Sequence, residues 1–300
     1  MRSMLFVPGD SERKFHKAMG IGADALILDL EDSVAAAGKP AARELTVAML
    51  REAVGEASRP RLYVRINGLD TPDWDADLRA IMPARPDGIV LPKPTSGEDV
   101  ERLAVALDHA ELAAETTRGA TKILPITTEV AVSVLQMNTY VGVSSRMDAM
   151  SWGAEDLSSQ IGGATNRGAD GGFTSPYRLV RDLCLITAVA AGAQPVDTVF
   201  VNFRDEAGLI AESREAARDG FTGKIAIHPA QVAPINEAFT PSAAEIARAQ
   251  QIIAVFEEKP GAGVAALDGE MLDRPHLVRA QRLIERARVA GVLPDTAQPP

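Results

Sequence analysis

Short apolar runs alternate with longer amphipathic stretches over about the first 240 residues. Eight runs are rich in aliphatic and β-branched side chains, and they cover residues 4–7, 25–28, 62–66, 88–91, 123–126, 148–151, 196–201 and 224–227. The stretches between them have the periodicity of helices, as in residues 40–54, 99–114, 130–141, 176–191 and 206–219. This alternation predicts buried parallel strands, each followed by a helix.

Eight strand–helix units predict an α/β protein with a closed (β/α)8 barrel, the TIM-barrel fold. The alternative is an open doubly wound sheet, which would place a glycine-rich fingerprint after its first strand, and Pro-Gly-Asp-Ser at positions 8–11 is not one. Two helix boundaries have clear signals. Ser175-Pro176 is typical of a helix start, and Asp219-Gly220 is typical of a helix end.

The pattern changes after about residue 240. A helix is expected at 243–256, a Gly/Ala-rich connector at 260–266 and a final helix at 275–290, and residues 295–300 are expected to be frayed. This tail is too short to bury a core of its own comfortably. The sequence therefore predicts a TIM-barrel catalytic domain, residues 1–240, and a C-terminal helical extension, residues 241–300, that packs on the barrel or on a neighbouring subunit.

Composition narrows the class of protein. With 46% hydrophobic and 24% charged residues the chain can bury a full core. The apolar run at the amino terminus is too short for a secretory signal, and no later run reaches about 18 apolar residues, so we expect a cytoplasmic protein without a membrane span. A net charge of −10 argues against nucleic-acid binding. The single cysteine, Cys184, excludes disulfides within the chain and is interpreted as a core residue.

Polar side chains follow most of the predicted strands. Because the carboxyl ends of barrel strands meet at one mouth, these side chains should face one another. They are Asp29, Glu31, Asp32, Arg65, Asn67, Lys93, Thr127, Thr128, Glu129, Glu155, Asp156, Asn202 and His228. Each has a structural alternative: Asp32, Glu129 and Asp156 as helix caps, His228 as a structural histidine, and Arg65 and Lys93 as surface charges.

The residue types at this mouth predict metal-assisted chemistry. Several carboxylates without a histidine pair suit Mg²⁺ better than zinc. One of the adjacent acids Glu155 and Asp156 should be a ligand, although the stretch alone does not decide which. Arg65 offers a planar fork for a carboxylate or an oxyanion, as carbon–carbon lyases and aldolases need. Lys93 could form a Schiff base, but the flanking prolines favour a role in directing the backbone.

Six motifs, in order along nearly the whole chain, resemble the citrate lyase β subunit and malyl-CoA lyase family, the CoA-ester lyase branch of the metal-dependent aldolases. They are Arg-Ser-Met-Leu-Phe-Val-Pro-Gly at 2–9, Leu-Asp-Leu-Glu-Asp-Ser-Val at 28–34, Val-Arg-Ile-Asn at 64–67, Leu-Pro-Lys at 91–93, Gly-Ala-Glu-Asp-Leu at 153–157 and Gly-Lys-Ile-Ala-Ile-His-Pro at 223–229.

The resemblance implies a role for nine residues. It implies that Glu129 and Asp156 are magnesium ligands, that Arg65 binds substrate, and that Glu31 and Asp32 hold the waters of the metal. It further implies that Phe6, Arg13 and Lys17 bind the adenine and phosphates of CoA, although Arg13 and Lys17 could form a solvated helix face. The segment Met-Leu-Asp-Arg-Pro at 271–275 implies that Asp273 reaches a neighbouring subunit's site in a homotrimer or hexamer. The alternative for Asp273 is a helix cap.

Two departures from the family pattern put the substrate in question. Val130 follows Glu129 where relatives often have threonine, and the predicted loop after Asp156 reads Ser-Ser-Gln at 158–160 where many have another acid. The glycine-rich segment 162–172, which contains Arg167, is interpreted from its composition as a mobile lid over the mouth.

The expected function is a magnesium-dependent lyase that cleaves or forms a 3-hydroxyacyl-CoA such as malyl-CoA or citramalyl-CoA, with an acyl-CoA and a 2-oxo acid as the other side of the reaction. Three alternatives remain open. They are a citrate lyase β subunit that needs an acyl-carrier partner, a malyl-CoA thioesterase, and a non-catalytic CoA-binding protein.

Overall fold

The computed structural model describes residues 1–56, 58–258, 261 and 263–294. By compactness the chain divides into two units, Met1–Asn236 and Glu237–Pro300. The predicted division lay between residues 240 and 241.

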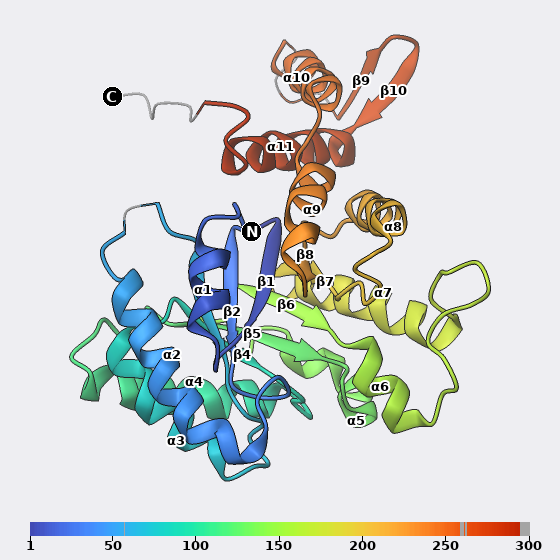
Figure 1. Ribbon diagram of the computed structural model, residues 1–300. Coiled ribbons are helices and arrows are strands. Elements are labelled where there is room, and N and C mark those ends of the chain that lie inside the picture. Colours follow the sequence, from blue (N-terminus) through green and yellow to red (C-terminus); the bar gives the residue numbers. More distant parts are fainter. Residues whose placement is uncertain (57, 259–260, 262, 295–300) are drawn as a thin grey trace. The chain divides into compact units, whose positions relative to one another are not determined.

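The first unit is a closed barrel of parallel strands surrounded by helices (Figure 1). Its strands are β1 (Ser3–Pro8), β2 (Ala25–Asp29), β3 (Arg61–Arg65), β4 (Gly88–Leu91), β5 (Lys122–Thr127), β6 (Ala149–Trp152), β7 (Gln194–Asp197) and β8 (Gly223–Ala226). They pair in chain order, and β1 also pairs with β8, which closes the barrel. The predicted TIM-barrel fold is therefore confirmed.

The helices of this unit follow the strands. They are α1 (Glu12–Met19), α2 (Lys39–Ala53), α3 (Asp73–Ile81), α4 (Gly97–Ala113), α5 (Ala131–Leu135), α6 (Ala154–Ile161), α7 (Ser175–Ala190), α8 (Glu206–Asp219) and α9 (Val232–Phe239), the last of which runs on into the second unit. Short 3-10 turns occupy Ala36–Gly38, Met82–Ala84, Met137–Tyr140 and Pro229–Gln231. Gly220, with φ 124°, ends α8 as its glycine predicted.

Every strand of the barrel contributes to one apolar cluster, which therefore fills the barrel interior. Its buried members are Met4, Ala25, Ile27, Tyr63, Val90, Leu124, Ile126, Ala149, Val196 and Ile225. Cys184 is fully buried in α7, as expected. The packed interior leaves the carboxyl ends of the strands as the place where polar side chains can gather.

Three local predictions in the first unit were wrong. The seventh strand was placed at 196–201 but lies at Gln194–Asp197, because the apolar run continues past the strand into residues that pack beyond its end. The helix expected at 130–141 is broken at Gln136 into α5 and a 3-10 turn. The cap of α7 is Thr174, one residue before the predicted Ser175.

The second unit holds α10 (Ala243–Glu257), β9 (Val264–Leu267), β10 (Glu270–Asp273) and α11 (Arg274–Val289). The two strands form an antiparallel hairpin, which was not predicted and whose first strand begins within the expected Gly/Ala-rich connector. Asp268 and Gly269 both have positive φ, 50° and 82°, as the two-residue turn that favours Asp-Gly requires. The residues predicted to be frayed, 295–300, lie outside the described part of the chain.

Ile246 and Ala249 of α10 pack against Ala280 and Ile284 of α11 in one apolar cluster of this unit. Phe256 packs with Ala265 and Leu272 of the hairpin in another. The C-terminal unit thus buries apolar side chains among its own elements. In the parts of the chain that the structure describes, none of the helices is long and apolar enough to cross a membrane.

Candidate active site

The ends of β2 and β3 place an acid directly opposite an arginine. Asp29 and Arg65 are partners in the parallel register, and the guanidinium donates from Nε to Asp29 Oδ1 and from Nη2 to Oδ2, both at 2.7 Å. Asp29 also accepts from the backbone N–H groups of Glu31 and Ser33. A forked, buried contact of this kind fixes the plane of the guanidinium. The third nitrogen of Arg65, Nη1, remains directed toward Glu31, 2.9 Å from its Oε2.

Glu129 is turned into the mouth by the chain around it. It follows Thr128, whose φ of 77° is in the left-handed region, and its carboxylate is buried, with only 4% of the residue exposed. Gly153, which precedes α6, leaves the space for this side chain. A Cβ atom at position 153 would lie 2.5 Å from Glu129 Cγ. The glycine between β6 and α6 is therefore required for the position of Glu129.

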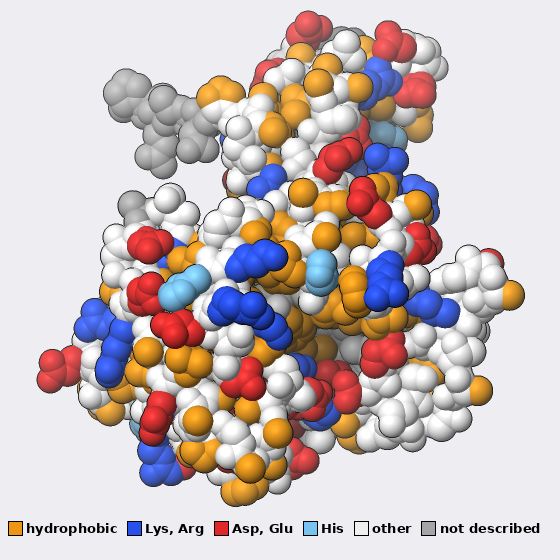
Figure 2. Space-filling model, viewed as in Figure 1, with side chains coloured by type: hydrophobic (Ala, Val, Ile, Leu, Met, Phe, Trp, Pro, Cys, Tyr) orange, Lys and Arg blue, Asp and Glu red, His pale blue; other side chains and the backbone are white. Residues whose placement is uncertain are grey.

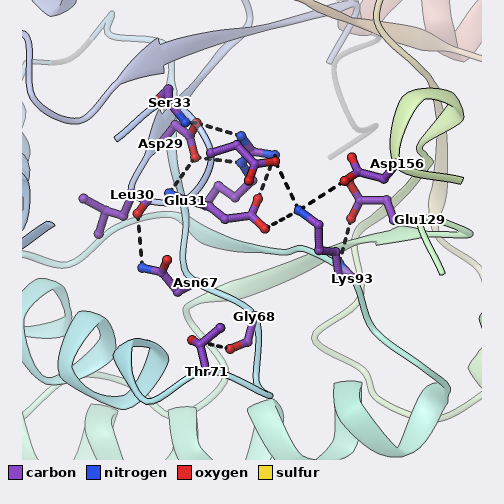
Figure 3. A network of polar contacts seen from close by, with 12 residues as sticks. Asp29, Leu30, Glu31, Ser33, Asn67, Gly68, Thr71, Lys93, Glu129 and Asp156 are labelled. Atoms are coloured by element: carbon purple, nitrogen blue, oxygen red, sulfur yellow. Dashed lines mark hydrogen bonds and ion pairs between the residues drawn. The ribbon is translucent and has the colours of Figure 1, made fainter. Parts of the chain in front are cut away.

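Lys93 points into the middle of the acidic side chains (Figure 3). Its Nζ lies 2.5 Å from Glu31 Oε1, 3.1 Å from Asp32 Oδ2 and 3.4 Å from Asp156 Oδ1. Its backbone N–H donates to Glu129 Oε2 at 2.6 Å. The alternative of an idle surface charge is excluded for this lysine by these contacts.

The environment changes the proton affinity of the buried acids. Burial raises the pKa of Glu129 to about 8, and the charge of Glu31 adds to that effect. Burial also raises the pKa of Glu31, against the opposing charges of Arg65 and Lys93. For Asp29 burial alone would raise the pKa, but the hydrogen bonds from Arg65 hold it below its ordinary value. The cluster therefore contains one firmly ionised carboxylate and two that are held unfavourably as anions.

The pKa of the two cations is shifted upward by the same contacts. Burial would lower the pKa of Lys93, but the ion pair with Glu31 outweighs it and raises the pKa above its ordinary value. Burial opposes the charge of Arg65 in the same way, and the hydrogen bonds to Asp29 raise its pKa. Both side chains stay charged at neutral pH.

The adjacent acids Glu155 and Asp156 lie in the first turn of α6 and point to different partners. Asp156 faces Lys93 within the cluster. Glu155 Oε1 instead accepts a hydrogen bond from Asn166 Nδ2 at 2.7 Å. Glu129 and Asp32 do not cap a helix, because the residue before α5 is Val130 and no helix begins at Asp32. The cap alternative therefore survives only for Asp156, as a first-turn acid.

A cavity of about 450 Å³ lies beside the cluster, and its walls include all three residues expected to bind CoA, namely Phe6, Arg13 and Lys17. Arg13 and Lys17 are exposed on α1, and Figure 2 shows Lys and Arg side chains gathered in this region next to a hollow with acidic side chains at its rim. Phe6 connects the cavity to the cluster, because the Arg65 guanidinium carbon lies 4.5 Å from the centre of its ring.

His228 is exposed at the wall of the same cavity. Its Nδ1 accepts from the backbone of Ala230, and its ring stacks on Phe203 with 4.9 Å between ring centres. His228 caps the turn before α9, so the structural alternative for this histidine is correct in part. The residue also lines the cavity.

Two expectations from the sequence are not met at the cluster of the barrel unit, one for Asp273 and one for residues 158–160. Asp273 belongs to the C-terminal unit, where it is the N-cap residue of α11 and lies 2.5 Å from His276 Nδ1. That hydrogen bond lowers the pKa of Asp273. Residues 158–160 were expected in a loop but are helical, in α6, and Gln160 accepts from the backbone N–H of Ala131.

Arg167 connects the glycine-rich segment 162–172 to α8 and to two aromatic rings. This side chain donates to Glu212 of α8 at 2.6 Å, and its guanidinium carbon lies 4.1 Å from the ring centre of Phe173 and 5.3 Å from that of Phe200. The interpretation of the segment as a mobile lid stays a prediction.

Sequence reasoning missed the roles of Asp29, Lys93 and Gly153. The register could have suggested the first, because an acid and an arginine at the ends of neighbouring strands must lie side by side. For Lys93 the flanking prolines drew attention to the backbone and away from the side chain. Nothing in the sequence shows that Gly153 is needed to leave room for Glu129.

An eight-stranded barrel whose carboxyl end carries acids and a fixed arginine beside a cavity defines the class of aldolase-type barrel enzymes. The family model HpcH/HpaI aldolase/citrate lyase matches residues 2–229, and a model described as a C-C bond lyase of the TIM-barrel fold matches residues 174–292. The chain belongs to the HpcH/HpaI aldolase/citrate lyase family, and it is an enzyme of the lyase class.

The similar proteins carry different activities. A (3S)-malyl-CoA thioesterase from Cereibacter sphaeroides is 37% identical over 95% of this chain and 94% of its own. A citrate lyase subunit beta from Leuconostoc mesenteroides subsp. cremoris is 35% identical over 95% and 93%. A mitochondrial citramalyl-CoA lyase from Rattus norvegicus is 34% identical over 95% and 86%.

One similar solved structure is protein CitE from Mycobacterium tuberculosis in complex with magnesium, acetoacetate and coenzyme A. It has a TM-score of 0.77 and 34% sequence identity, and the match covers 96% of this chain and 98% of that one. The resemblance to this family that the motifs indicated is therefore confirmed.

Proposed function

We propose that the protein is a magnesium-dependent carbon–carbon lyase that cleaves a 3-hydroxyacyl-CoA, such as malyl-CoA or citramalyl-CoA, into an acyl-CoA and a 2-oxo acid, or that joins the two. The observation that carries the proposal is the gathering of Glu129, Asp156 and Glu31 around Lys93, next to the fixed Arg65, which packs on the Phe6 ring at the wall of the cavity. The CitE complex with magnesium, acetoacetate and coenzyme A supports it.

The residues present fit a magnesium ion. The donor set is made of carboxylates, which hard divalent cations prefer. Glu31 Oε2 is buried and has no hydrogen-bond partner, although Arg65 lies close by. Burial disfavours the ionised form of Glu129. Glu129 and Asp156 would hold the ion, with Glu31 and Asp32 beside them. When bound, Mg²⁺ supplies a Lewis acid for the oxygens of the 2-oxo acid.

The protein's own residues would divide the remaining work. Cleavage breaks the bond between C2 and C3 of the acyl chain as the 3-hydroxyl gives its proton to the solvent and becomes the carbonyl of the 2-oxo acid. The electron pair passes to the thioester, and Arg65, oriented by Asp29, would stabilise the resulting enolate oxygen. A proton then returns to C2. We propose Asp273 of a neighbouring subunit for this transfer, and Phe6, Arg13 and Lys17 for binding the CoA portion.

A panel of CoA esters tests the proposal. Malyl-CoA, citramalyl-CoA and citryl-CoA are incubated with the protein in Mg²⁺ or in excess EDTA, and 2-oxo acid and free thiol are both followed. The expected result is release of glyoxylate, pyruvate or oxaloacetate with the thioester intact, and loss of that activity in EDTA. Equal cleavage in EDTA would contradict the magnesium dependence.

The second candidate is a malyl-CoA thioesterase, which the 37% identity to a relative of that name favours. Free CoA and malate would then appear without glyoxylate in the same assay. Cleavage of free CoA esters would exclude the need for an acyl-carrier partner, which the citrate lyase relative raises. A protein that binds CoA but neither binds Mg²⁺ nor turns over any ester would be non-catalytic.

A further inference from the structure

Lys93 touches all four acids that surround the proposed magnesium site. Its ammonium contacts Glu31, Asp32 and Asp156 at 2.5, 3.1 and 3.4 Å, and its backbone N–H donates to Glu129. In Figure 3 the side chain runs between Glu31 on one side and the Glu129–Asp156 pair on the other. The ammonium therefore lies next to the Asp156 carboxylate, which is one of the two proposed metal ligands.

The backbone holds the lysine in this place. Lys93 has φ 50°, in the left-handed region, and stands between Pro92 and Pro94. The φ angle of each proline is fixed by its ring, and Pro94 also restricts the residue before it. These restrictions and the hydrogen bond from the Lys93 N–H to Glu129 hold the backbone, and rotation of the side chain can move the ammonium.

The charges explain why the ammonium stays. Among the described residues, Arg65 and Lys93 are the cations that form ion pairs with Glu31, Asp32 and Asp156, and two nitrogens of Arg65 are engaged by Asp29. Carboxylates that share a cation repel one another, and the repulsion is strong where water is scarce. Lys93 is thus a counter-ion that allows Glu31, Asp32 and Asp156 to lie together.

We infer that Lys93 is a positioning residue that competes with the metal ion and sets its affinity. The inference rests on the proposed magnesium site. A divalent ion that takes Asp156 must weaken the contact of that carboxylate with the ammonium and then lie beside a second positive charge. Lys93 therefore stabilises the metal-free site and weakens metal binding, which leaves the metal exchangeable.

The test measures Mn²⁺ binding directly, from the electron paramagnetic resonance signal of the free ion, with Mg²⁺ as competitor. Lys93→Met and Lys93→Gln remove the charge, and Lys93→Arg keeps it. Lys39→Met is the matched control, because Lys39 Nζ lies nearby but donates to the backbone carbonyls of Leu30 and Glu31 and to Asn67. Removal of the charge at Lys93 should tighten Mn²⁺ binding about tenfold or more. Lys93→Arg and Lys39→Met should remain near the wild type.

A second measurement separates this role from simple scaffolding. In EDTA, Lys93→Met and Lys93→Gln should melt at a lower temperature than the wild type, while the rise in Tm on saturation with Mn²⁺ should be larger. A residue that only holds the site in shape would weaken metal binding when replaced. Unchanged or weaker Mn²⁺ binding in both neutral variants would overturn the inference, as would equal tightening in Lys93→Arg. Absence of Mn²⁺ binding by the wild type would overturn the magnesium site itself.

Discussion

Burial and the charge of Glu31 change the proton affinity of Glu129. Burial in the folded protein raises its pKa to about 8, against an ordinary value of 4.5. The folded protein therefore holds a proton that the unfolded chain releases. The stability that comes from this proton is complete below about pH 4.5 and is lost as the pH rises through 8.

The prediction for Glu129→Gln follows from that difference, because glutamine has nearly the same shape and cannot ionise. Between pH 6 and 8 in EDTA, the wild type should lose about 1 kcal/mol of unfolding free energy per pH unit relative to the variant. Urea denaturation at several pH values gives this difference directly. Parallel pH curves for the two proteins would show that Glu129 does not carry a raised pKa.

The same residue links pH to metal binding. Mg²⁺ must displace the proton of Glu129 before this carboxylate can serve as a ligand, so affinity should rise with pH up to about 8 and then level off. Arg65 provides the contrast at this scale. Its charge does not depend on pH in this range, and its orientation is fixed by Asp29.

At the scale of elements, the junction between β6 and α6 controls the site on the neighbouring strand. Gly153→Ala places a Cβ atom 2.5 Å from Glu129 Cγ, and φ −120° at this position is allowed for alanine. The backbone accepts the change but Glu129 must move. We predict a loss of Mn²⁺ affinity of about 10- to 100-fold, measured by the same resonance titration.

Gly38→Ala is the control for this prediction. Gly38 also stands at the N-cap of a helix, α2, and has φ −89°. A Cβ atom there would lie 3.6 Å from Val34 Cγ1, an ordinary contact. This variant should bind Mn²⁺ as the wild type does. Equal effects of the two substitutions would mean that the contact with Glu129 is not the cause.

Much of the barrel could be predicted because parallel strands buried on both sides must be apolar, and because their carboxyl ends converge. The positions of Glu31, Glu129 and Asp156 follow from that convergence. The roles of Lys93 and Gly153 do not, since they depend on a left-handed backbone angle and on the space around one side chain. The hairpin of β9 and β10 was missed because its strands are short, although Asp268-Gly269 signalled the turn.

At the scale of the whole molecule, the two units differ in what they contribute. The barrel holds the carboxylates, the arginine and the cavity, whereas Asp273 lies in the C-terminal unit. The relatives match this chain over 95% of its length, so the C-terminal unit is part of what they share. We propose a homotrimer or hexamer in which each barrel receives Asp273 from a neighbour.

Mixed oligomers test this arrangement. Asp273→Ala and Glu129→Ala should each be inactive alone, the first because it lacks the group proposed for proton transfer and the second because it lacks a metal ligand. Co-expressed with two different tags and purified through both, a trimeric mixture should regain roughly a third of the wild-type activity, because every mixed trimer has one intact barrel that receives an intact Asp273 from its neighbour.

Glu129→Ala mixed with Asp156→Ala is the control for the mixed oligomers, because both residues belong to the same barrel and no intact site can form. Recovery in the first mixture and not in the control would place Asp273 in the neighbour's site. If neither mixture recovers, Asp273 does not act across subunits. The role of Asp273 would then be to stabilise the C-terminal unit, through its contact with His276 at the start of α11.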